Sequence, residues 1–252
     1  MRSGLSKPER GATVAIGMSA EIRIGASGFS YKEWLGGFYP PKLPGAKMLA
    51  YYAERLPTVE INYTFRAMPK RSMLEGWAEK TPPHFRFALK APQRITHFAR
   101  LRGAGDTLNY FIDTAGALGE RLGIVLFQLP PDMTCDNALL ADFLGELNGR
   151  VRTAFEFRHR SWFGDATLST LRAGAAAFCI AESDKLSSPI ERTAPHVYMR
   201  LRKERYDDAE LREWARRIRE LAEGANEVCA YFKHEAAAPA LAARLHQLVT
   251  AG

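Results

Sequence analysis

The stretch GIVLFQLP at Gly123–Pro130 carries the pattern that decides the fold of this chain. Its apolar residues favour a buried β-strand, and Gln128 places a polar side chain at the carboxyl end of that strand. Seven further runs of strand type recur along the 252 residues, and most of them also end in polar or charged side chains. They are IRIGASG (Ile22–Gly28), TVEINYT (Thr58–Thr64), FRFALKAP (Phe85–Pro92), RTAFEFRH (Arg152–His159), AAFCIAES (Ala176–Ser183), HVYMRLR (His196–Arg202) and EVCAYFKH (Glu227–His234).

Most gaps between these runs show helical periodicity. Ala46–Leu56, Pro69–Lys80 and Gly105–Leu122 are predicted helices, and Asp136 or Asn137 is predicted to cap another that ends at Leu147. Eight β/α units in roughly 230 residues predict a single (β/α)8 TIM barrel of the α/β class. The sixth unit is irregular, because the residues around Ser187-Ser188-Pro189 show no helix.

The composition is that of an ordinary globular protein. Net charge is +7, but the basic residues are spread along the chain, and the densest helical stretch, Arg212–Arg219, has the pattern of a solvated helix face capped by Asp207 or Asp208. Three scattered cysteines favour reduced thiols, and no apolar run approaches the ~20 residues that span a bilayer, so a cytoplasmic location is expected.

A single barrel domain is predicted over residues 21–252. Residues 1–20 are expected to form a flexible N-terminal extension. The apolar part of this extension, Ala12–Met18, is too short for a secretory signal. Met18 is an alternative to Met1 as the start of translation.

TIM-barrel enzymes have their active sites at the carboxyl ends of the strands, so the polar residues that end these runs are the candidate site. Glu60 and Glu156 lie on strands from opposite sides of the predicted barrel and are candidates for acid/base catalysis. The alternative is that each carboxylate is merely paired with Lys90, Arg158 or Arg200. These three cations are the pattern that phosphate or carboxylate recognition requires.

Other polar residues near the predicted mouth are weaker candidates. His97 is a candidate acid/base or hydrogen-bond donor, and no metal site is expected, because the histidines lack a spacing such as His-x-His. Tyr31 belongs to an aromatic loop that either walls a pocket or packs as a lid. The remaining candidates for substrate binding are Gln128, Asn62, Glu182 and His159.

Several segments together carry a family resemblance. GASGFSYKEWLGGFYP, VEINYTF, FALKAPQRITH, LFQLPP, AFEFRHRSWF and VYMRLR occur in this order between Ile22 and Leu248. They resemble the YecE-like family, the domain of unknown function 72. The resemblance implies a TIM barrel, as the strand count does, and implies no established activity.

The chain departs from the family's usual pattern near the last strands. Arg202-Lys203 stand where the family has His-Gly, Lys233-His234 stand where it has Asp-Asn, and Glu182 stands where Asp is common.

The sequence is therefore compatible with three hypotheses for the function. The leading hypothesis is an enzyme, a hydrolase or an isomerase, that acts on a small phosphorylated or carboxylated substrate at the barrel mouth. The second is a nucleic-acid-binding or processing protein, favoured by the net charge and the aromatic loop. The third is a barrel without catalysis that binds a partner, favoured by the changes near the last strands. The cofactor and the oligomeric state are left open.

Overall fold

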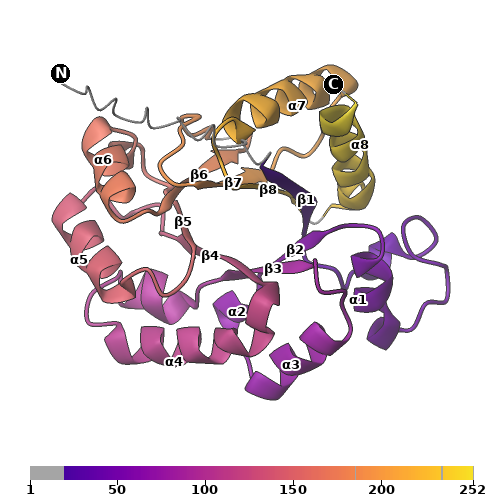
Figure 1. The fold of residues 1–252 in the computed structure, drawn as a ribbon, viewed down its shortest axis with the longest axis horizontal. Helices are drawn as coiled ribbons and strands as arrows, with labels where there is room; N and C mark the ends of the chain where they lie inside the picture. Colours follow the sequence, from indigo (N-terminus) through magenta and orange to yellow (C-terminus); the bar gives the residue numbers. More distant parts are fainter. Residues whose placement is uncertain (1–19, 185, 234, 252) are drawn as a thin grey trace, which may run out of the picture.

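A closed barrel of eight parallel strands forms the centre of the molecule (Figure 1). The computed structural model describes residues 20–184, 186–233 and 235–251, so the predicted extension at residues 1–19 and His234 lie outside the described part. The strands follow one another in sequence order, and β8 closes the barrel against β1. They are β1 (Glu21–Ser27), β2 (Thr58–Ile61), β3 (Arg86–Lys90), β4 (Leu122–Gln128), β5 (Thr153–Glu156), β6 (Ala177–Glu182), β7 (His196–Leu201) and β8 (Glu227–Phe232).

Helices surround the barrel on its outside (Figure 1). The α-helices are α1 (Gly45–Ala53), α2 (Tyr63–Arg66), α3 (Arg71–Glu79), α4 (Gly105–Ala115), α5 (Asn137–Leu147), α6 (Asp165–Ala173), α7 (Asp208–Ala222) and α8 (Ala238–Thr250). Shorter helical turns are η1 (Lys32–Trp34), η2 (Arg94–Phe98), η3 (Gly116–Arg121) and η4 (Arg160–Trp162). The predicted TIM barrel is confirmed.

The helix caps follow the sequence signals. Of the two candidates before α5, Asp136 is the cap, and its carboxylate accepts a hydrogen bond from the Leu139 amide at 3.0 Å. At α7 the cap is Asp207, which forms a reciprocal capping box with Glu210. The irregular sixth unit is also confirmed, because residues 183–184 and 186–195 contain no helix between β6 and β7.

Several element boundaries differ from the predictions, and two of them concern a helix end and the end of β2. The helix predicted to reach Leu122 ends at Ala115 and gives way to η3, because Gly119 adopts a left-handed φ of 55° that an α-helix cannot contain. The strand predicted to reach Thr64 ends at Ile61, so Glu60, Asn62 and Thr64 do not share one strand face. There the chain turns into α2, and Thr64 Oγ1 donates a hydrogen bond to the Lys90 carbonyl at 2.7 Å.

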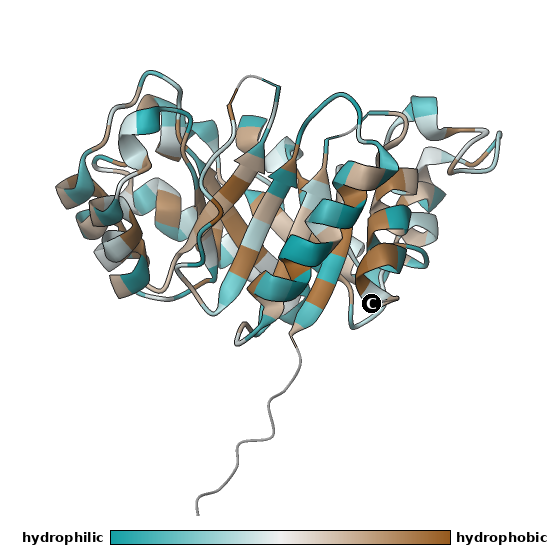
Figure 2. Cartoon of the chain, turned by 90° about the horizontal axis from the view of Figure 1, so that it is seen from above, coloured by the Kyte–Doolittle hydropathy of each residue, from teal (hydrophilic) through white to brown (hydrophobic). Residues whose placement is uncertain are grey.

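Alternation along the strands sends every second side chain into the barrel lumen. Figure 2 shows hydrophilic and hydrophobic residues following one another along the strands. At the N-terminal end of the lumen, Arg23 and Glu227 form an ion pair of 2.9 Å. The middle is filled by a cluster of small and aromatic residues that includes Tyr198 and Tyr231, whose ring centroids lie 5.0 Å apart. The C-terminal end is polar, and its side chains form the candidate site.

A glycine gives β1 its close contact with β2. A Cβ atom at Gly25 would lie 2.0 Å from the carbonyl oxygen of Thr58, so no larger residue fits without moving the strand. This approach brings Ser27, two residues later on β1, opposite Glu60 on β2.

Candidate functional site

One arginine holds the two candidate carboxylates. Arg200 projects from β7 and is only 2% exposed, and its Nη2 lies 2.8 Å from Glu60 Oε1 on β2. Its Nη1 lies 2.5 Å from Glu156 Oε2 on β5. The guanidinium therefore joins opposite sides of the lumen. Among the sequence-based alternatives for Glu60 and Glu156, the structure shows the ion-paired arrangement.

Both carboxylates remain ionised near neutral pH. Burial raises the pKa of Glu156, but the nearby guanidinium groups of Arg200, Arg158 and Arg202 outweigh that effect and lower the pKa to about 2. Burial also raises the pKa of Glu60, and Arg200 together with hydrogen bonds brings it below its usual value. Neither group is suited to donate a proton at pH 7 in this arrangement.

Three polar neighbours complete the surroundings of Glu60. Ser27 Oγ donates to Glu60 Oε1 at 2.7 Å, and the Tyr198 hydroxyl donates to Oε2 at 2.8 Å. Asn62 Nδ2 donates to Oε1 at 3.2 Å, so Asn62 reaches the site although it lies beyond the strand. Glu60 is fully buried, and these bonds offset the removal of its charge from water.

Lys90 lies at the end of β3 beside Gln128 at the end of β4. Lys90 Nζ donates to Gln128 Oε1 at 2.7 Å and lies 3.9 Å from the centre of the Phe65 ring on α2. Burial and the Arg200 charge lower the pKa of Lys90 to about 8, against the raising effect of Glu156 and Glu60. The pKa of Lys90 is thus much closer to neutral pH than the pKa of an exposed lysine.

A cavity of about 680 Å³ opens above these residues at the C-terminal mouth. Polar and aromatic side chains contribute to its lining, among them Ser27, Tyr31, Asn62, Phe65 and Gln128. Its charged lining consists of six cations and no carboxylate among the described residues, namely Arg66, Lys90, Arg158, Arg200, Arg202 and Lys233.

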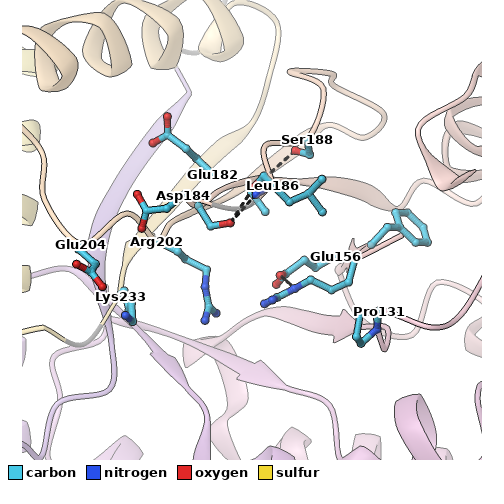
Figure 3. A pocket seen from close by; sticks show the side chains of 13 residues that line it. Pro131, Glu156, Glu182, Asp184, Leu186, Ser188, Arg202, Glu204 and Lys233 are labelled. Atoms are coloured by element: carbon cyan, nitrogen blue, oxygen red, sulfur yellow. Dashed lines mark hydrogen bonds and ion pairs between the residues drawn. The ribbon is translucent and has the colours of Figure 1, made fainter. Parts of the chain in front are cut away.

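A second cavity of about 460 Å³ adjoins the first and shares Arg158, Arg202 and Lys233 with it. Glu182 lines this second cavity but points away from Glu156 (Figure 3) and accepts a hydrogen bond from Trp214 Nε1 on α7 at 3.1 Å. The structure therefore does not bring Glu182 into the group around Arg200. The lumen-facing positions of β6 are taken by Ala177, Cys179 and Ala181 instead.

The remaining predicted residues lie at the margin of the site. Tyr31 lines the larger cavity, and its hydroxyl donates to the Ser27 carbonyl at 2.9 Å. His97 packs edge-on against Phe65, with ring centres 4.9 Å apart, and burial together with Lys90 lowers its pKa. His159 is half-buried and caps η4 by accepting from the Ser161 amide, so it is not brought into the group.

Within the aromatic loop, Trp34 and Tyr39 are 1% exposed and pack together as a lid beside the barrel, while Tyr31 faces the larger cavity. One part of this loop thus packs as a lid and another part lines a cavity, so each of the two alternatives describes a part of the loop.

Sequence reasoning missed seven residues of the site: Ser27, Tyr63, Phe65, Arg66, Tyr198, Arg202 and Lys233. Strand alternation could have found Tyr198 and Arg202, because they lie two residues before and after Arg200. Phe65 gave no such signal, because its position depends on the turn that ends β2.

The described residues contain no group of three or more His, Cys, Asp or Glu side chains arranged to hold a metal ion. In the same part of the chain, no helix is both long and apolar enough to cross a membrane.

The fold and this group of side chains define a TIM barrel with a charged C-terminal mouth. Residues 23–252 match the family described as Protein of unknown function DUF72, and the chain belongs to this family. The curated relatives are themselves uncharacterised, and no activity is established for the chain.

Relatives in two bacteria show the extent of the likeness. The chain is 32% identical to the UPF0759 protein YunF of Bacillus subtilis over 60% of its own length and 57% of that protein. It is 30% identical to the UPF0759 protein YecE of Escherichia coli K12 over 69% of its own length and 62% of that protein. The chain thus covers less than two thirds of either relative.

Solved structures of the family share the fold over a larger part of the chain. A DUF72 family protein from Thermotoga maritima superposes with a TM-score of 0.81 and 25% identity, and the match covers 91% of this chain and 99% of that one. One from Enterococcus faecalis, at 18% identity, has a TM-score of 0.77, with 91% and 95% covered.

Proposed function

We propose that the protein is an enzyme that binds a small phosphorylated or carboxylated substrate in the larger cavity at the barrel mouth. The observation that carries this proposal is the charge of the lining, with six cations and no carboxylate among the described residues. Arg200 is paired with Glu60 and Glu156, Arg158 with Glu156, and Lys233 with Glu235, so the six cations share three carboxylates and the mouth keeps an excess of positive charge among the described residues. Guanidinium and ammonium groups in such a setting form strong, charge-assisted hydrogen bonds to phosphate and carboxylate oxygens.

In this proposal Glu60 and Glu156 have a positioning role, which their ion pairs support. They hold the guanidinium of Arg200 in one orientation at the base of the cavity, with contacts of 2.8 and 2.5 Å. Breaking either pair would leave a buried charge without its partner. Lys90 and His97 are then the groups whose pKa values suit proton transfer near neutral pH.

This assignment favours an isomerase over a hydrolase that uses two carboxylates. A glycosidase-type pair requires one carboxyl group that is protonated at working pH, whereas Glu156 has a pKa of about 2. Proton abstraction next to a carbonyl or carboxyl group requires one base near the substrate and cations that stabilise the resulting negative charge. Lys90 beside Arg158 and Arg200 meets both requirements.

The charges on the outside of the barrel favour a small anion over a nucleic acid. Arg216 and Arg217 on α7 are ion-paired with Glu213, and Arg212 is paired with Asp208. The densest basic helix is therefore largely neutralised, unlike the mouth. A nucleic-acid-binding surface would instead present cations to successive phosphates along an open face.

Calorimetry and thermal shift with inorganic phosphate and malonate as probes test the proposal. We expect both anions to bind the wild type, and the double variant R158Q/R202Q to bind about tenfold more weakly or not at all. The matched control is R216Q on α7, which removes an exposed arginine and should bind phosphate as the wild type does.

Absence of binding by both anions would contradict the proposal. A dT20 oligonucleotide that binds with a steeply salt-dependent affinity, while phosphate does not bind, would favour the nucleic-acid hypothesis instead. If the anions bind, abstraction is tested by deuterium exchange at the carbon next to the carbonyl of dihydroxyacetone phosphate. Binding without exchange would indicate a binding protein that lacks this chemistry.

A further inference from the structure

Lys90 differs from the other buried cations of the lumen. Arg23 and Arg200 each contact two carboxylates. Lys90 is 8% exposed, and no carboxylate oxygen among the described residues lies within 4.0 Å of its Nζ. Its described hydrogen-bond partner is a neutral amide oxygen, Gln128 Oε1 at 2.7 Å.

The amino group of Lys90 also lines the cavity where the anion is proposed to bind. Phe65 covers one side of it, with the ring centre 3.9 Å from Nζ, and α2 holds that ring in place through the bond from Thr64 to the Lys90 carbonyl. The amine is therefore fixed on two sides, and Lys90 lines a space of about 680 Å³. A nucleophile requires such positioning within reach of a bound molecule.

The surrounding charges favour loss of the proton from this amine. Burial is the largest effect, and Arg200 and Arg158 add to it, while Glu156 and Glu60 oppose it, with a resulting pKa of about 8. The other titratable or charged residues that line this cavity or face Lys90 are His97, Tyr31, Tyr63, Arg66, Arg202 and Lys233. At pH 7.4 roughly a fifth of such amines are neutral, whereas an exposed lysine is almost wholly protonated.

We propose that Lys90 is a nucleophilic lysine that forms an imine with an aldehyde or ketone carrying a phosphate or carboxylate group. The inference rests on the proposed function, because Arg158, Arg202 and Lys233 would hold the anionic group of the same molecule. It narrows the substrate class from anions in general to anionic carbonyl compounds.

The covalent step balances without any further reactant. The neutral Nζ attacks the carbonyl carbon, the carbonyl electron pair moves to oxygen, and a proton passes from nitrogen to that oxygen to give a carbinolamine. The carbinolamine then takes up one proton and loses water, which leaves a protonated imine with a carbon–nitrogen double bond. The Phe65 ring face and the Gln128 oxygen would stabilise the cation so formed, as they stabilise the ammonium group.

Borohydride trapping tests the proposal. The protein is incubated with dihydroxyacetone phosphate or with uncharged dihydroxyacetone, reduced with sodium borohydride, and digested for mass spectrometry. We expect the phosphorylated probe to label Lys90 on the order of a hundredfold faster than the exposed lysines at pH 7.4, because more of its amine is neutral. Labelling should saturate, be prevented by inorganic phosphate, and be weak with dihydroxyacetone.

The pH dependence provides a second readout. Labelling of Lys90 should reach half of its maximum near pH 8, the pKa of that amine, and labelling of exposed lysines near 10.5. The matched variant is K90R, which keeps a cation at this position and lacks the nucleophile. It should lose the adduct and keep phosphate binding.

The outcomes separate the two proposals. Phosphate binding together with labelling of Lys90 no faster than that of exposed lysines would overturn the imine and leave the anion site intact. Labelling of Lys90 that phosphate does not prevent, or that is equal for the two probes, would also overturn it. Absence of phosphate binding would overturn the proposed function itself. Because these comparisons use the wild type, they hold even if K90R fails to fold.

Discussion

The two ends of the barrel lumen both bury charges, but they arrange them differently. At the N-terminal end Glu227 contacts two guanidinium groups, Arg23 at 2.9 Å and Arg152 at 2.5 Å, and Arg23 also pairs with Glu21. Carboxylates and guanidiniums are equal in number there. At the C-terminal end Arg200 contacts two carboxylates, Arg158 shares Glu156 with it, and Lys233 pairs with Glu235. Arg66, Lys90 and Arg202 line the same cavity and have no ion pair among the described residues, so cations are in excess there.

The two ends of the lumen therefore differ in the roles that we propose for them. A balanced, closed network satisfies its own charges and acts mainly to fix the strands in register. An excess of one sign around a cavity leaves a positive potential that attracts anions. Burial of charge alone therefore does not distinguish the two ends of this barrel. The excess of cations does, and we propose the functional site at that end.

The largest expected effect comes from removing the cation shared by the two carboxylates. Arg200→Met leaves Glu60 and Glu156 facing one another in the lumen, and should lower the free energy of unfolding by about 3–5 kcal/mol. Urea denaturation measures it. The control is Arg158→Met, whose side chain is 32% exposed and which should cost about 1 kcal/mol or less. Equal losses for the two variants would mean that Arg200 is not the central partner.

A smaller loss of stability is expected from a change at the N-terminal end of the lumen, and this change should leave phosphate binding unaltered. Glu227→Gln removes the carboxylate shared by Arg23 and Arg152 and should lower the free energy of unfolding by about 2–4 kcal/mol. Calorimetry with phosphate should give the wild-type Kd, because this network lies at the other end of the lumen. A changed Kd would show that the two ends are coupled.

Low pH should destabilise the protein at the C-terminal end of the lumen by protonating Glu156. Its pKa is about 2 in the folded protein, below the usual value of 4.5, so its contribution to stability is present above pH 4.5 and is lost as the pH falls toward 2. The contribution should be about 2–3 kcal/mol. Urea denaturation from pH 6 down to 3 compares the wild type with Glu156→Gln, whose stability should fall less steeply. Parallel slopes would contradict the assignment.

The smallest effect concerns Lys90 and has the opposite pH dependence. Because its folded pKa of about 8 lies below the unfolded value of 10.5, the unfolded chain binds more protons between these values, and stability from this group rises with pH. Lys90→Met removes this term. The stability of the variant relative to the wild type should therefore fall by roughly 1–2 kcal/mol between pH 7 and 10. A constant difference would show that Lys90 titrates normally.

The sequence predicts this fold well, because each strand is a short apolar run with a polar end. It fails where a single side chain redirects the backbone. At Thr64 a hydroxyl that bonds the Lys90 carbonyl helps end β2 early, and at Gly119 a left-handed φ ends a helical pattern. Neither event leaves a periodic signal, because each depends on one contact or one conformation.

The site is predicted in part for a related reason. Strand ends meet at one mouth in any TIM barrel, so Glu60, Lys90, Gln128, Glu156 and Arg200 could be grouped from the sequence. Which of these residues pair with one another could not be predicted from the sequence, because the pairing depends on side chains that meet across the lumen. Glu182 was misplaced for a simpler reason, since strand alternation from Cys179 and Ala181 already directs it outward.

The two tyrosines in the middle of the lumen limit how molecules exchange at the mouth. Tyr198 and Tyr231 are buried beneath the polar layer, and their hydroxyls are engaged by Glu60 and Thr58. They close the lumen below the polar layer, so whatever reaches Lys90 through the mouth leaves by the route along which it arrived. In the proposed enzyme, product would therefore depart before the next substrate enters, and a molecule that occupies the opening would slow arrival and departure alike.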